Sequence, residues 1–162
     1  MATDVDGARD LLRHVVATVA YRAAKALRDA PADFGGFLAG GGTRSPGEIL
    51  AHMGDLFDWA LSIAEGRERW NSATPRPWAE EGERFFGAVK RFDDYLASPA
   101  ALGSSAEKLF QGALADSLTH IGQINLLRRL AEAPVRGESY FRAEIERGRV
   151  GRDQAAPRRE FE

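Results

Sequence analysis

Apolar residues recur at intervals of three and four along most of the chain, and this spacing is the feature that most restricts its fold. Between residues 5 and 27 the repeat includes Leu12, Val16 and Val19, which predicts a helix with one buried face. Pro31 and a group of glycines then end that segment. No stretch alternates apolar and polar residues as a half-buried strand does. The sequence therefore predicts an all-α fold.

A second helix is predicted to begin at Ser45. Ser45 suits the N-cap, Pro46 the first helical position, and Glu48 the third position of a capping box. Apolar residues continue the helical spacing until Gly66, which is placed to end the helix. Residues 67–77 include two prolines and are predicted to form an extended connection that can cross the end of a bundle.

Two further helices follow this connection. The first is predicted over residues 79–97, where Ser98 and Pro99 stop it. The second is predicted to start at a Ser104 cap, with Glu107 three residues later, and to continue unbroken to about residue 132. Four amphipathic helices predict a four-helix bundle, a fold that builds metal and ligand sites from side chains on facing helices.

Residues 1–146 are predicted to form one domain. The total length of 162 residues suits a single core. A short helix is expected near Tyr140 and Ile145, at the end of this domain. Residues 147–162 carry charges of both signs and are predicted to form a loosely ordered tail.

Charge and composition argue against several classes of function. The chain has 22 Lys and Arg residues against 24 Asp and Glu residues, a formal charge of −2, so nucleic acid is not an expected partner. It has no apolar run of ~18 residues and no signal-peptide pattern, so a cytoplasmic protein without membrane contact is predicted. Because it has no cysteine, a bound metal would need His, Asp or Glu ligands.

Two of the three histidines lie on apolar helix faces, and one of them has a carboxylate beside it. His52 lies among apolar residues of the second helix. Asp116 and His120 on the last helix are about 40° apart around the axis and about 6 Å apart along it. Both are predicted to project toward the interior, where a carboxylate is costly unless it is paired or binds a cation. Two imidazoles and one carboxylate would make an open site for a divalent metal.

A simpler interpretation of these residues stays open. An Asp and a His four residues apart can form a helix-face pair that contributes only about a few tenths of a kcal/mol. A single His at the border of an apolar face, such as His52, is more often a core residue than a ligand. The metal interpretation is favoured by the combination of three such side chains in a chain without thiols.

Three other residues are candidates for the surroundings of this site. Gln123, about one turn beyond His120, suits a hydrogen bond to that imidazole, although an ordinary interhelical Gln has the same spacing. Trp59, seven residues after His52, suits a pocket wall, although core packing also explains it. His14, on the first helix, suits either the mouth of the cavity or the surface.

The sequence around the candidate ligands resembles the DinB/YfiT-like superfamily of metal-dependent helical bundles. That family has a His on the second helix and a His-x-x-x-His pair on the last one, often followed by Gly-Gln. His52 and His120 match this pattern, as do Gly122 and Gln123. Asp116 stands where the commonest pattern has His. Some members that use small thiols, such as the mycothiol-dependent maleylpyruvate isomerases, have a carboxylate at that position.

This resemblance extends over about residues 8–133 and implies an up-down-down-up bundle with a long crossover between the second and third helices. It implies a divalent metal held by His52, Asp116 and His120. Zinc and nickel are expected first, and iron and manganese accept the same donors. It further implies a homodimer and a low-molecular-weight thiol, such as bacillithiol or mycothiol, as co-substrate.

Two functions follow from the sequence and stay open. The first is a metal-dependent enzyme, a thiol S-transferase or a hydrolase, that acts on a small molecule. Because the chain has no cysteine, its nucleophile would be water or the sulfur of a small thiol. The second is a non-catalytic dimeric bundle, such as a stress-related scaffold, that binds a metal or a ligand. Such an interface would use four aromatic residues if they are exposed: Trp70, Trp78, Tyr140 and Phe141.

Overall fold

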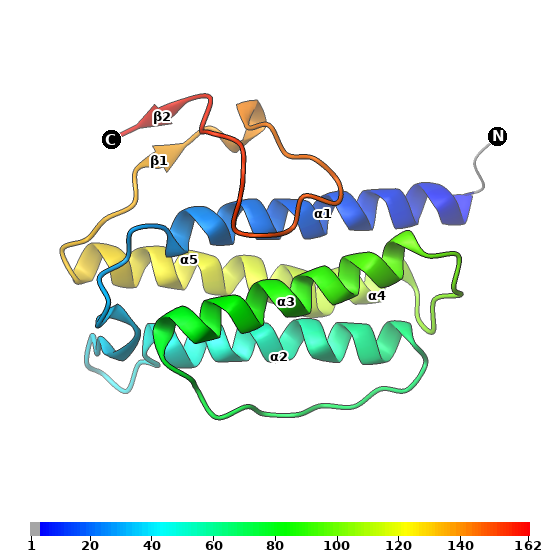
Figure 1. Ribbon diagram of the computed structural model, residues 1–162, viewed down its shortest axis with the longest axis horizontal. Coiled ribbons are helices and arrows are strands. Elements are labelled where there is room, and N and C mark those ends of the chain that lie inside the picture. Colours follow the sequence, from blue (N-terminus) through cyan, green and yellow to red (C-terminus); the bar gives the residue numbers. More distant parts are fainter. Residues whose placement is uncertain (1–3) are drawn as a thin grey trace.

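The computed structural model describes residues 4–162, with side chains from Gly7 onward. This part of the chain contains four long helical runs (Figure 1). The first three are single helices: α1 (Asp4–Leu27), α2 (Pro46–Ala64) and α3 (Trp78–Ala97). The fourth run consists of α4 (Ala106–Leu109), a π-helical turn (Phe110–Leu114) and α5 (Ala115–Leu130).

The four runs pack as a bundle, which confirms the predicted all-α fold class. Helices α1 and α5 run in one direction, and α2 and α3 run in the opposite direction (Figure 1). Helix α2 packs against α3 and α5, and α1 packs against the same two helices. The face that α2 shares with α5 is the one that positions the candidate ligands.

Aromatic side chains fill the centre of the bundle. The ring of Phe57 on α2 lies 5.8 Å from that of Phe85 and 6.0 Å from that of Phe92, both on α3. All three are completely buried, and burial of each contributes about 1.5–3 kcal/mol to stability. Among the described residues, no helix combines the length and the apolar character needed to cross a membrane.

Helix α2 begins as the sequence predicts. The Ser45 hydroxyl accepts a hydrogen bond from the Glu48 backbone N–H, and the Glu48 carboxylate accepts one from the Ser45 N–H at 2.7 Å. These bonds hold the pKa of Glu48 below its ordinary value. Pro46 occupies the first helical position. The helix ends at Ala64, and Gly66 follows with a φ of +74°, a conformation that glycine adopts without strain.

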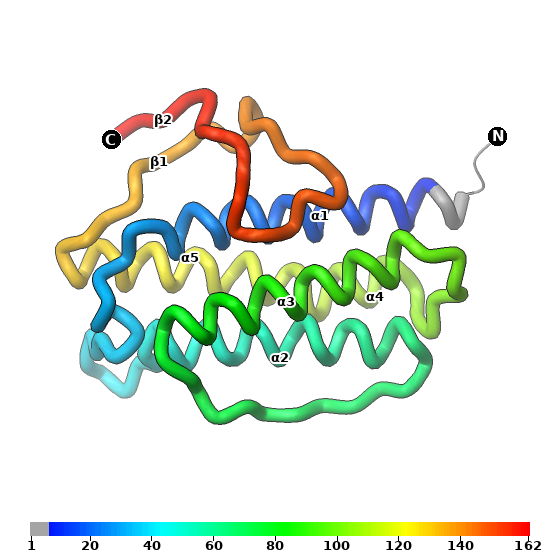
Figure 2. Tube along the Cα trace, viewed as in Figure 1, coloured from blue at the N-terminus to red at the C-terminus, as the bar shows by residue number. Residues whose placement is uncertain are grey.

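The connection between α2 and α3, residues 65–77, returns along the outside of α2 to the opposite end of the bundle (Figure 2). Two buried carboxylates hold it in place. Asp55 of α2 accepts a hydrogen bond from the Ala73 N–H at 3.0 Å, and Glu81 of α3 accepts one from the Arg76 N–H at 2.8 Å. The connection is therefore fixed to two helices along its second half.

The fourth run differs from the predicted unbroken helix in two ways. Its N-cap is Ser105 rather than Ser104, because Ser105 has the extended backbone and its hydroxyl accepts a hydrogen bond from the Lys108 N–H. The π-helical turn then interrupts the α-helical register before Ala115. Such turns add a residue to a helix, so they shift the face that the following residues present.

The C-terminal segment is more ordered than the sequence predicts. In place of a short helix it has a single 3₁₀ turn, Tyr140–Arg142, and residues 147–162 fold back over α1 instead of forming a loose tail (Figure 1). Strand β1 (Gly137–Glu138) pairs antiparallel with β2 (Glu160–Phe161). Lys25 lies 2.7 Å from the buried carboxylate of Glu138 and 2.9 Å from Glu160. These ion pairs join residues far apart in the sequence and connect the C-terminal segment to α1.

Candidate metal centre

The structure brings the three predicted ligands together at the α2–α5 contact. His52 Nε2 lies 3.6 Å from one carboxylate oxygen of Asp116, and His120 Nε2 lies 3.5 Å from the other. One donor atom from each of the three residues lies within 4.8 Å of the other two. The rings of His52 and His120 are 4.9 Å apart and nearly perpendicular. We refer to these three residues as the His/Asp cluster.

The spacing of the His/Asp cluster fits a bound divalent ion better than direct hydrogen bonds. Distances of 3.5 and 3.6 Å are too long for a hydrogen bond between an imidazole nitrogen and a carboxylate oxygen. Zinc binds such atoms at about 2.0–2.2 Å, which places two ligands of a tetrahedral ion about 3.3–3.6 Å apart. The two separations, each to a different Asp116 oxygen, lie in this range, and the three donor atoms lie within 4.8 Å of one another, close enough to converge on one ion after small side-chain shifts.

Gln123 orients one of the two imidazoles. Its amide oxygen lies 2.7 Å from His120 Nδ1. An amide oxygen can only accept, so Nδ1 carries the proton, and the lone pair of His120 is on Nε2, the atom beside Asp116. The predicted hydrogen bond between His120 and Gln123 is thus present, with Nδ1–H as the donor, and it prepares His120 to act as a ligand.

The environment of His52 favours its neutral form. Burial lowers the pKa of His52, and electrostatic repulsion from Arg44 and from His120 in its protonated form lowers it further, against the opposing effect of Asp116. Only a neutral imidazole can donate a lone pair to a metal. The surroundings of His52 therefore keep it in the state that a ligand requires.

The cluster opens to solvent at Asp116. The Asp116 side chain is 47% exposed, whereas His52 and His120 are mostly covered. This corrects the prediction that Asp116 projects into the interior. The residue lies at the outer edge of the α2–α5 contact, where both histidines remain within reach of its carboxylate. A small molecule can thus approach the cluster from this side.

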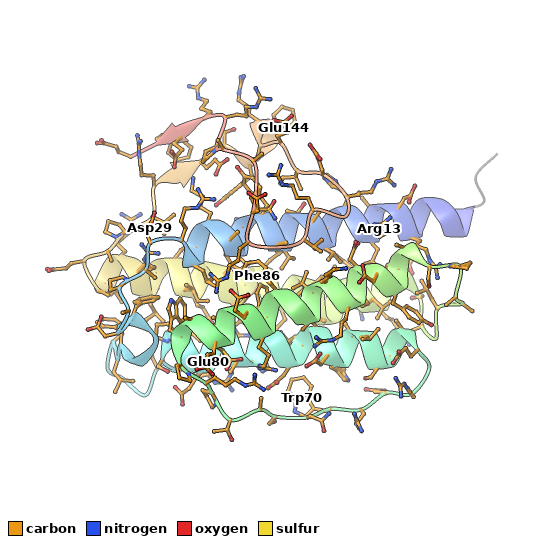
Figure 3. The ribbon with its side chains drawn as sticks, in the orientation of Figure 1. Arg13, Asp29, Trp70, Glu80, Phe86 and Glu144 are labelled. Atoms are coloured by element: carbon orange, nitrogen blue, oxygen red, sulfur yellow. The ribbon has the colours of Figure 1, made fainter. Side chains whose placement is uncertain are left out.

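Trp70, in the connection, was not predicted to lie at the cluster. Its ring lies 5.6 Å from that of His52, and it is turned from the connection toward α2 (Figure 3). The predicted wall residue Trp59 lies 5.8 Å from Trp70, nearly perpendicular to it, and is partly buried against the core. Trp70 therefore covers His52, and Trp59 supports Trp70.

His14 is not part of the cluster. It lies on an exposed face of α1, and the group of converging donor atoms does not include it. Asp55 lies one turn beyond His52 on α2, but it is buried and paired with Arg84 at 3.0 Å. Neither residue has the position of a ligand.

Comparisons of the chain with protein-family models, with curated proteins and with solved structures gave no match. The resemblance to the DinB/YfiT-like superfamily therefore stays a prediction that depends on the residues named above. Function must be inferred from the geometry of the His/Asp cluster.

Proposed function

We propose that the His/Asp cluster binds one divalent metal ion and that the protein is a metal-dependent enzyme acting on a small molecule. The observation that carries this proposal is the position of the Asp116 carboxylate. One of its oxygens lies 3.6 Å from His52 Nε2 and the other lies 3.5 Å from His120 Nε2, too far for hydrogen bonds, and one donor atom from each residue lies within 4.8 Å of the other two.

The arrangement of the helices supports membership of the DinB/YfiT-like superfamily, which we include in the proposal. The parallel helices α2 and α3 are joined by a connection that returns along the bundle, which suits an up-down-down-up topology (Figure 1). His52 and His120 stand at the positions of the family pattern, and Gln123 hydrogen-bonds to His120.

The roles of the chain's own residues follow from their positions. His52, Asp116 and His120 would hold the ion, and Gln123 keeps the His120 lone pair directed toward Asp116. The ring of Trp70 keeps water away from one side of His52. With three protein ligands, a bound ion keeps open positions where it can polarise a carbonyl group or activate water or a thiol. Zinc and nickel suit two nitrogen donors and one oxygen donor best, with iron and manganese next.

Thiol transfer and hydrolysis remain the two proposed reactions. The chain has no cysteine, so a thiol nucleophile would have to come from a low-molecular-weight co-substrate. A hydrolase would need only water. The exposed Asp116 leaves room for either at the open side of the cluster.

A non-catalytic, dimeric metal-binding bundle is the second candidate. It is favoured by the openness of the cluster, because an exposed carboxylate encloses a reaction less well than a deep cavity. Of the aromatic residues considered for the dimer interface, Trp78 packs on Phe34 and Tyr140 packs on Tyr21 within the same chain. Phe141 is 98% exposed and stays available for such an interface.

Both candidate functions require a bound metal ion, and metal analysis of untagged protein tests this requirement. We expect near one equivalent of a divalent metal in the native chain, and loss of most of it in His52→Ala and in Asp116→Asn. Retention of the metal by both variants would show that the His/Asp cluster is not the metal site. Turnover of thiol or ester substrates by the loaded protein would then separate the enzyme from the scaffold.

A further inference from the structure

Trp59 and Trp70 form an aromatic wall along one side of the His/Asp cluster. Trp70 lies against His52, with 5.6 Å between ring centres, and Trp59 lies against Trp70 at 5.8 Å. A methyl group at Gly112 would lie 3.6 Å from the Trp59 ring, so the wall reaches the π-helical turn. Gly112 lies four residues before Asp116, about one helical turn away. The wall therefore spans from α2 to the helix that carries Asp116.

The polar edges of both indoles are already bonded within the chain. The Trp59 N–H donates to Glu68 at 3.1 Å, and the Trp70 N–H donates to Ser72 at 3.0 Å. These two hydrogen bonds hold the rings in place. The aromatic wall therefore presents the apolar faces of the rings to a ligand. The Asp55 bond to the Ala73 N–H holds the same part of the connection against α2.

Trp70 keeps part of its ring surface open to solvent. It is 44% exposed, whereas the core rings of Phe57 and Phe85 are fully buried. The solvent-exposed Asp116 belongs to the same cluster that Trp70 adjoins. An apolar ring surface and an open carboxylate thus both adjoin His52.

We propose that the ligand of this site is a small molecule with an anionic metal-binding group joined to a flat apolar group, such as an aromatic ring, that packs on Trp70. This inference rests on the proposed metal centre and adds the class of substrate. Packing of one aromatic ring on another stabilises a complex through apolar burial and through the preferred geometry of ring pairs. Metal coordination would hold one end of the ligand, and Trp70 the other.

The test uses cobalt-loaded full-length protein and two hydroxamate probes. Acetohydroxamate and benzohydroxamate carry the same chelating group and differ in the phenyl ring. Their binding is followed by the change in the cobalt absorption band, a readout that needs no turnover, and gel filtration checks that the protein keeps its cobalt. We expect benzohydroxamate to bind at least about 10-fold more tightly, which corresponds to about 1.4 kcal/mol.

Substitution of Trp70 decides the origin of this preference. Trp70→Ala should reduce the ratio of the two probe affinities to less than about 3-fold, whereas Trp70→Phe should keep most of the preference. Phe141→Ala, at an exposed position in the C-terminal segment, is the control and should change neither probe.

The outcomes separate the two proposals. A cobalt band with equal binding of the two probes, or with a phenyl preference that survives Trp70→Ala, overturns the role of the aromatic wall and leaves the metal centre intact. Absence of a cobalt band that depends on His52 and Asp116 overturns the metal centre and the inference built on it.

Discussion

Helix α2 contributes one side chain to each of two groups of ionisable residues, and the groups differ in how completely their members are paired. Toward α3, Arg84 pairs with Asp55 at 3.0 Å and with Glu81, and it also donates to the Ala51 carbonyl. We call these three charged residues the Arg84 network. Toward α5, the His/Asp cluster has no direct bond from either imidazole to Asp116, and its carboxylate is 47% exposed.

The difference shows what each group can do. The two carboxylates of the Arg84 network are buried, and each is hydrogen-bonded both to Arg84 and to a backbone N–H of the connection. The network needs no ligand, and its role is structural. The His/Asp cluster places a partly exposed carboxylate within 3.6 Å of two imidazole nitrogens without a hydrogen bond to either, an arrangement that suits a bound cation. The predictions below test this contrast.

The largest effect is expected from Arg84→Met. It would leave Asp55 and Glu81 buried without their cation, and breaking a buried pair in this way costs about 3–5 kcal/mol of stability. Chemical denaturation measures the change. Arg91→Met is the matched control, because Arg91 pairs with Asp58 at an exposed position, where an ion pair contributes about 0–1 kcal/mol. Equal losses in the two variants would contradict a structural role for the network.

Asp116→Asn should abolish tight metal binding with little effect on the metal-free fold. We expect more than about 100-fold weaker zinc affinity, since loss of a ligand should exceed the effect of losing an outer-sphere partner. Competition with a chelator measures the affinity. Asp58→Asn, on α2 at similar exposure, serves as the control and should bind zinc normally. Zinc at about 100 times its Kd should stabilise the wild type by about 2.7 kcal/mol and should not stabilise Asp116→Asn.

Gln123→Leu should weaken zinc binding by about 10–100-fold, because it removes the hydrogen bond that orients His120. Gln123→Glu keeps an acceptor at the same place and should restore most of the affinity. His14→Gln changes a histidine outside the cluster and should have no effect on the same titration. Normal affinity in Gln123→Leu would show that His120 needs no such partner.

The smallest effect concerns the metal-free protein at acidic pH. Burial holds the pKa of His52 below its unfolded value of about 6.5, so the unfolded chain takes up the proton first as the pH falls. The stabilisation from neutral His52 is present above that value and is lost as the pH falls toward the lower folded pKa. Unfolding free energies between pH 7.5 and 5.5 should therefore decline more in the wild type than in His52→Gln. An identical decline would contradict a lowered pKa.

The helices and the approach of His52 to Asp116 and His120 could be predicted, because both follow from local rules. Helical spacing and the Ser45 capping box depend on residues close in sequence. Two helices with inward faces then bring their polar residues together in a bundle. The exposure of Asp116 could not be predicted, because it depends on how the helices rotate against each other.

The conformations of the connection and of the C-terminal segment could not be predicted either, because both depend on contacts between residues far apart in the sequence. The position of Trp70 depends on hydrogen bonds from the connection to Asp55 and Glu81, on two different helices. The order of the C-terminal segment depends on Lys25 meeting Glu138, 113 residues away. Neither contact leaves a pattern in the local sequence.

Anomalous diffraction from zinc-loaded crystals at the zinc absorption edge tests the central claim most directly. The account predicts one strong peak at the α2–α5 contact, about 2.0–2.2 Å from His52 Nε2, His120 Nε2 and an oxygen of Asp116. No peak between these side chains, or a peak bonded to only one of the two histidines, would contradict it.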